Sequence, residues 1–104
     1  MRRRQISLAA LALCSLPLAA VAAGDEIRIA HIHSLTGPLE AYGKQTTTGF
    51  MMGLDYATGG TMTVAGRKLV VIEKDDQGKP DLGKNLLAAA YGDDKVDIAV
   101  GTTG

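Results

Sequence analysis

The chain has a single cysteine, Cys14, and therefore cannot form an internal disulfide, which excludes a fold held together by disulfides. Its N-terminal apolar run, residues 6–18, is shorter than the roughly 20 apolar residues that span a bilayer. Low-complexity tracts and internal repeats are absent. Basic and acidic side chains number 11 each, so no basic excess points to nucleic acid or an anionic membrane as a partner. With 46% hydrophobic residues and mixed charges, the composition is that of a globular protein.

The N-terminal segment has the three parts of a secretory signal peptide. Arginines occupy positions 2–4, the apolar run follows, and small residues come next. Cleavage after Ala23 or after Ala22 fits the small residues at this point. We therefore expect residues 1–23 to be a signal peptide that is removed, and the mature protein to be periplasmic. An N-terminal helix that stays in place is the structural alternative.

Cys14 raises the alternative of a lipid anchor. Leu11-Ala12-Leu13-Cys14 resembles a lipoprotein box, but Leu13 is large where a small residue is expected. Ordinary secretion is therefore preferred. Removal of residues 1–23 takes away three arginines and no acid, which leaves eight basic and eleven acidic side chains and a net charge of −3.

Strand and helix patterns alternate along the rest of the chain. Short β-branched apolar runs predict strands, and apolar residues at steps of three and four predict helices. Pro80 suits the first position of the second helix. The predicted order is strand 26–33, helix 40–57, strand 67–73, helix 80–92 and strand 96–100. This order predicts an α/β fold that begins with a parallel βαβαβ unit.

The predicted helix over 40–57 has one face that the spacing assigns to the sheet. Its members are Tyr42, Thr46, Gly49, Phe50, Gly53 and Ala57. Because glycine inside a helix costs about 1 kcal/mol relative to alanine, two glycines on this face predict close packing of helix against sheet.

Ligands of open parallel sheets bind beyond the carboxyl ends of the strands, where this chain places residues 34–42, 75–76 and 101–104. Asp75 and Asp76 could form a catalytic carboxylate pair, but adjacent acids at a strand end more often cap backbone N–H groups. The loop Gly101-Thr102-Thr103-Gly104 combines glycines and hydroxyls whose backbone N–H groups suit a carboxylate. A simple strand-to-helix turn accounts for the same residues equally well.

The chain lacks the sequence motifs of several kinds of site. Five residues separate Gly37 from Gly43-Lys44, where a phosphate loop needs four, and no GxGxxG follows the first strand. His31 and His33 point to one face of a strand, but no Cys or third His completes a metal site, so we interpret both as structural. No Ser-His-Asp or Cys-His arrangement can be assembled from the residues present. We therefore expect no enzyme, no metal and no other cofactor.

Three stretches resemble the type I periplasmic solute-binding proteins of branched-chain amino-acid ABC transporters, the leucine-binding-protein family. They are LTGPLEAYGK at 35–44, EKDDQGKP at 73–80 and DKVDIAVG at 94–101. They occur in the order and spacing of that family, and the resemblance covers essentially all of residues 26–104.

The resemblance implies a two-lobed protein that closes about a hinge on a ligand held between its lobes, without chemistry. Residues 24–104 correspond to the N-terminal part of the first lobe, and we expect this piece alone neither to fold cooperatively nor to bind ligand. By resemblance Thr102, Thr103 and Gly104 bind the ligand, and Tyr42 lines the cleft. The implied ligand is a small carboxylate, either a branched-chain amino acid or an aromatic acid, and the implied partner is an ABC permease. A sensory receptor module with the same fold is the alternative.

Overall fold

The computed structural model describes residues 25–104, which form four strands and two helices. Their bounds are β1 Glu26–His33, α1 Glu40–Ala57, β2 Thr63–Val64, β3 Arg67–Asp75, α2 Pro80–Gly92 and β4 Ile98–Gly101. The predicted α/β architecture is confirmed. Among these residues, neither helix is long and apolar enough to cross a membrane.

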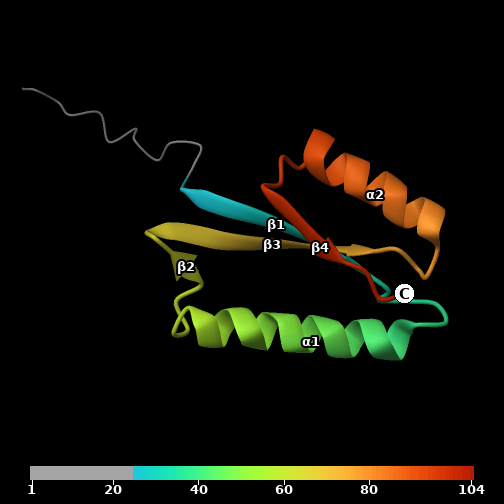
Figure 1. The fold of residues 1–104 in the computed structure, drawn as a ribbon, viewed down its shortest axis with the longest axis horizontal. Coiled ribbons are helices and arrows are strands. Elements are labelled where there is room, and N and C mark those ends of the chain that lie inside the picture. The colour runs from blue at the N-terminus through green and yellow to red at the C-terminus, as the bar shows by residue number, and fades with distance from the viewer. Residues whose placement is uncertain (1–24) are drawn as a thin grey trace, which may run out of the picture.

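The strands make one sheet in the order β2-β3-β1-β4, and the two helices cover its opposite faces (Figure 1). Strand β1 is central and pairs in parallel with β3 and with β4. This is the arrangement expected of a βαβαβ unit, because each crossover helix returns the chain to the same end of the sheet. The carboxyl ends of the three parallel strands therefore meet at one edge.

Strand β2 is a feature that the sequence analysis did not predict. Thr63 pairs with Lys68 and Val64 with Arg67 in an antiparallel hairpin. The turn consists of Ala65 and Gly66, both with positive φ (52° and 76°). Two such residues give the tight hairpin turn whose twist matches that of the strands. A two-residue strand is too short to leave a pattern in the sequence.

Helix α2 covers an apolar core on one face of the sheet. It begins at Pro80, as predicted, and Asp81 lies in its first turn, where a negative charge is favourable. The buried residues of this core are Ala30, Ile32, Ala90 and Val96, with Ile72, Leu86 and Ala99 packed against them. Strand β4 starts at Ile98 rather than at residue 96, because Val96 turns inward and its N–H donates to the Ala90 carbonyl (3.1 Å).

The predicted inner face of α1 is wrong at most of its positions, and Phe50 is the exception. Tyr42 is 64% exposed, and a Cβ atom built on Gly49 or Gly53 would meet no atom within 4 Å. The least exposed residues of α1 are Gly43, Thr47, Met51 and Leu54, together with the predicted Phe50. Thr47 was not among the predicted inner residues, and it faces a buried histidine described below.

One glycine of α1 does lie very close to the sheet. A Cβ atom on Gly43 would be 1.6 Å from the carbonyl oxygen of Ser34, just beyond β1. No side chain can occupy that space, so only glycine allows the first turns of α1 to approach the strand end. The close contact positions the loop that joins β1 to α1.

Candidate functional site

A cavity of about 480 Å³ lies at the carboxyl edge of the parallel sheet. Its wall comes from the ends of β1 and β4, from the loop between β3 and α2, and from the first two turns of α2. The lining residues are Ile32, Ser34, Leu39, Asp76, Gly78, Lys79, Pro80, Gly83, Lys84, Leu87, Ala99, Val100, Gly101, Thr102 and Gly104. The size is in the range of small-molecule sites, and the place is the one expected for a parallel sheet.

Ser34 and Asp76 form the buried polar base of this cavity. The Ser34 hydroxyl donates to Asp76 Oδ1 at 2.6 Å, and both residues are buried. The same oxygen accepts the N–H of Gly78 (2.8 Å), while the Asp76 N–H donates to the His33 carbonyl (3.0 Å). These bonds tie the end of β1 to the loop before α2. The cavity wall is therefore preorganised.

Asp75 organises the loops next to the cavity residues Ser34 and Asp76. Its Oδ1 accepts the N–H groups of Leu35 (2.9 Å), Thr36 (3.2 Å) and Gln77 (2.9 Å), and its Oδ2 accepts the Thr36 hydroxyl (2.6 Å). The bond from the Thr36 hydroxyl, helped by the three N–H donors, lowers the pKa of Asp75 to about 2. Two adjacent acids engaged in this way act as caps, so the predicted structural role of Asp75 and Asp76 is confirmed.

The loop after β4 forms the last part of the wall. Of the four predicted ligand-binding residues, two line the cavity and two do not. Thr102 and Gly104 line the cavity. Thr103 does not line it, but its hydroxyl accepts the N–H of Ser34 (2.8 Å) and so joins this loop to β1. Tyr42 lies on the exposed side of α1 and is not a lining residue. Roles for these residues in ligand binding stay predictions.

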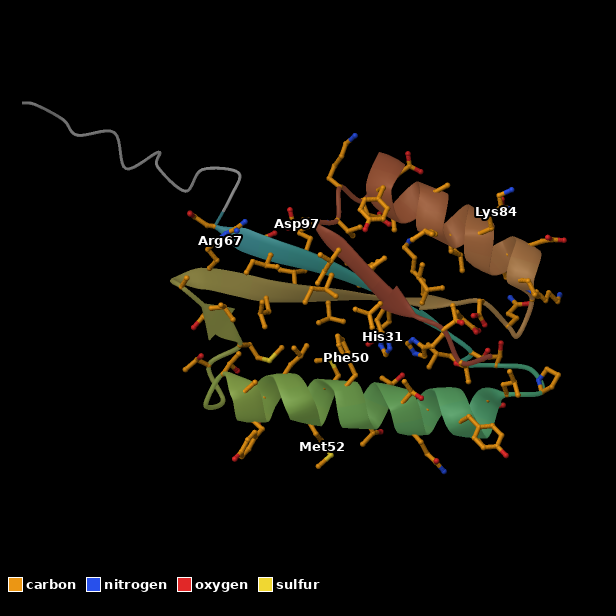
Figure 2. The ribbon with its side chains drawn as sticks, viewed as in Figure 1. His31, Phe50, Met52, Arg67, Lys84 and Asp97 are labelled. Carbon is orange, nitrogen blue, oxygen red and sulfur yellow. The ribbon has the colours of Figure 1, made fainter. Side chains whose placement is uncertain are left out.

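The charge at the cavity favours an anion. Lys79 and Lys84 line it, and neither takes part in the ion pairs among residues 25–104. Figure 2 shows Lys84 extending from the outer side of α2, away from the sheet, so Lys79 is the lysine that can offer its charge to the cavity. Lys79 directly precedes the first turn of α2, where free N–H groups carry partial positive charge. The only acid in the wall, Asp76, already accepts two hydrogen bonds.

Sequence reasoning placed Ser34 at the ligand-binding edge, within residues 34–42, because the carboxyl ends of parallel strands carry the site. It missed Gly78 and Lys79 as cavity residues. No local pattern distinguishes Gly78 or Lys79 from other loop residues.

Residues 26–104 match the family described as periplasmic binding protein. The chain belongs to this family. Its α/β fold and its parallel sheet are those of a lobe of a periplasmic binding protein. No curated protein matches the chain.

Solved structures of periplasmic binding proteins show the same similarity. An ABC transporter protein from Rhodopseudomonas palustris is 66% identical (TM-score 0.74) over 76% of this chain and 23% of its own. A branched-chain amino acid transporter protein of ABC type from R. palustris CGA009 is 68% identical (TM-score 0.73) over 74% of this chain and 21% of its own. A solute-binding protein from R. palustris BisB5, solved with 3,4-dihydroxybenzoic acid, is 33% identical (TM-score 0.65) over 72% and 20%.

The chain thus spans less than a quarter of the length of these matched structures. The family and the matched structures are substrate-binding proteins of transporters and imply a place outside the cytoplasm. The predicted signal peptide lies in residues 1–23, outside the described residues.

Proposed function

We propose that this chain supplies part of the solute site of an exported binding protein that serves an ABC importer. The solute is a small carboxylate with an apolar group, either a branched-chain amino acid or an aromatic acid. The observation that carries the proposal is the cavity at the carboxyl edge of the sheet, where Lys79, the start of α2 and the loop through Gly104 meet. The permease of the importer is the proposed partner.

The cavity wall supports both halves of such a ligand. Ile32, Leu39, Leu87, Ala99 and Val100 supply apolar surface for an aliphatic or aromatic group. The polar part of the wall, at Lys79 and the 101–104 loop, offers an ammonium and backbone N–H groups to a carboxylate. In this arrangement the protein captures the solute and performs no chemistry on it.

The two proposed ligand classes correspond to two matched structures. The R. palustris protein at 68% identity is described as a branched-chain amino acid transporter, which supports an aliphatic amino acid. The protein at 33% identity was solved with 3,4-dihydroxybenzoic acid, which supports an aromatic acid. The higher identity favours the amino acid.

Titration calorimetry on the full-length gene product tests the proposal with leucine, isoleucine, benzoate and 3,4-dihydroxybenzoate. We expect saturable binding of at least one of them, with leucine or isoleucine bound more tightly than the aromatic acids. Tighter binding of the aromatic acids would mean that the solute is an aromatic acid rather than a branched-chain amino acid. Absence of heat with all four ligands would refute it.

Two threonine variants test whether the ligand binds at this cavity. Thr102→Val removes a hydroxyl from the cavity wall, and we expect a loss of affinity of about 10- to 100-fold, as for a hydrogen bond to a charged group. Thr48→Val is the matched control. The Thr102 hydroxyl donates to the Gly104 carbonyl (2.8 Å), and the Thr48 hydroxyl likewise donates to the Lys44 carbonyl (3.1 Å), but on the exposed side of α1. Equal affinities of the two variants would place the ligand elsewhere.

A further inference from the structure

Two histidines and a glutamate gather on the sheet face that α1 covers. His31 and His33 are two residues apart on β1 and therefore point to the same side. Glu73 on β3 is the register partner of His31, which places its side chain on that side too. Figure 2 shows His31 directed from the sheet toward α1, opposite Phe50, and the two rings are 4.4 Å apart. This is the face opposite the apolar core under α2.

The three side chains have the spacing of a metal site. Glu73 Oε2 lies 3.2 Å from His31 Nδ1 and 3.1 Å from His33 Nε2. One possible ligand atom from each residue lies within 4.8 Å of the other two. Ligands at about 2.0–2.1 Å from a tetrahedral zinc ion are separated by roughly 3.4 Å from one another. Small side-chain rotations would therefore bring all three into coordination.

Both imidazoles are buried, and their nitrogens are incompletely paired. His31 is 1% exposed and His33 is fully buried; His33 Nδ1 has no hydrogen-bond partner, and the group near His31 Nδ1 is Glu73 Oε2 at 3.2 Å. A buried polar atom without a partner destabilises the fold. A cation beside Glu73 would bind His31 through Nδ1 and His33 through Nε2, the nitrogen 3.1 Å from Glu73.

Two further features define the surroundings of the three side chains. Thr47 Oγ1 of α1 lies 2.5 Å from His33 Nε2, so this nitrogen exchanges the hydroxyl for the ion when a metal binds. Glu73 keeps 31% of its side chain exposed, which leaves a route by which an ion and a water ligand can enter.

We propose that His31, His33 and Glu73 form a binding site for a divalent transition-metal ion of the zinc type. Two imidazoles and one carboxylate suit Zn²⁺, whereas Ca²⁺ and Mg²⁺ prefer oxygen ligands alone. A water molecule completes the tetrahedron. The ion joins β1 to β3 beneath α1, and none of its three ligands lines the solute cavity. The site is therefore independent of the proposed solute binding.

The test uses the full-length gene product, made without a histidine tag and freed of metal with a chelator. Zn²⁺ is titrated by calorimetry, and Co²⁺ is added separately because its visible spectrum reports tetrahedral nitrogen and oxygen ligands. The variants are His31→Gln, His33→Gln and Glu73→Gln, each checked by circular dichroism. Glu26→Gln is the matched control, since Glu26 is an exposed acid on β1 that pairs with Arg28.

We expect the wild-type protein and Glu26→Gln to bind Zn²⁺ equally and to give the tetrahedral Co²⁺ spectrum. Loss of a ligand should lower Zn²⁺ affinity by at least about 10- to 100-fold, the effect of removing even an outer partner of a metal site. If the buried histidine variants do not fold, Glu73→Gln decides, because it keeps size and shape. Zn²⁺ binding of unchanged affinity in Glu73→Gln, or no binding by the wild type, would overturn the proposal.

Discussion

The close approach of Gly43 to the Ser34 carbonyl leads to a prediction whose sign contradicts helix propensity. Alanine is favoured over glycine inside a helix by about 1 kcal/mol. At Gly43, however, the new Cβ atom would start 1.6 Å from a backbone oxygen, and such contacts are essentially never below 3.0 Å. We expect Gly43→Ala to destabilise the protein.

The magnitude follows from what must move. The contact has to lengthen by about 1.4 Å, and the atom in the way belongs to the backbone, so no side-chain rotation relieves it. Overpacking of this kind costs about 1–3 kcal/mol, more than the gain in helix propensity. Because Ser34 forms the base of the cavity, a shift of α1 should also weaken solute binding.

Two other glycines of the same helix provide the control. Gly49 and Gly53 have no atom within 4 Å of a built Cβ, so Gly49→Ala and Gly53→Ala should stabilise by up to about 1 kcal/mol each. Urea denaturation of the full-length gene product measures all three changes in the free energy of unfolding. If Gly43→Ala proves as stable as Gly49→Ala, the close packing of α1 on the strand end is wrong.

Three further substitutions test other contacts. Ser34→Ala leaves Asp76 without its 2.6 Å hydrogen bond, and urea denaturation should show a loss of about 1–3 kcal/mol in the free energy of unfolding. An unchanged midpoint would mean that water replaces the hydroxyl. Lys79→Met should weaken carboxylate binding in calorimetry, while Lys68→Met, at the other end of the sheet, should not; equal effects would argue against an anion at α2. Ala65→Gly should raise the melting temperature slightly, since alanine at φ 52° is strained by about 1 kcal/mol, and a lower melting temperature would refute that strain.

Much of the fold was predictable because its signals are local. The β-branched runs of β1 and β3, Pro80 at the start of α2 and the turn residues each depend on near neighbours in the chain. The caps that Asp75 and Asp76 form on the adjoining turn, at the N–H groups of Gln77 and Gly78, were predictable for the same reason. Their bonds to residues 34–36 required the parallel pairing of β1 with β3.

The orientation of α1 could not be predicted from its own residues. Glycine and threonine on a helix carry little preference for the core or the solvent, so spacing alone chose the face of Gly49 and Gly53. The steric demand of one backbone oxygen at Gly43 and the buried His33 beside Thr47 select a different face. The partners are His33 in β1 and Ser34 just beyond it, both outside the helix.

The sequence by itself determined the class of fold, the positions of most elements and membership of a binding-protein family, because periodicity and short motifs persist without three-dimensional context. Only the tertiary structure decided which residues meet. Asp76 joins Ser34 across 42 positions, Thr103 joins Ser34 across 69, and Glu73 joins His31 through the register of two parallel strands. Such pairs depend on which strands are neighbours and in what register, and that is set by burial of the whole sheet rather than by any local stretch.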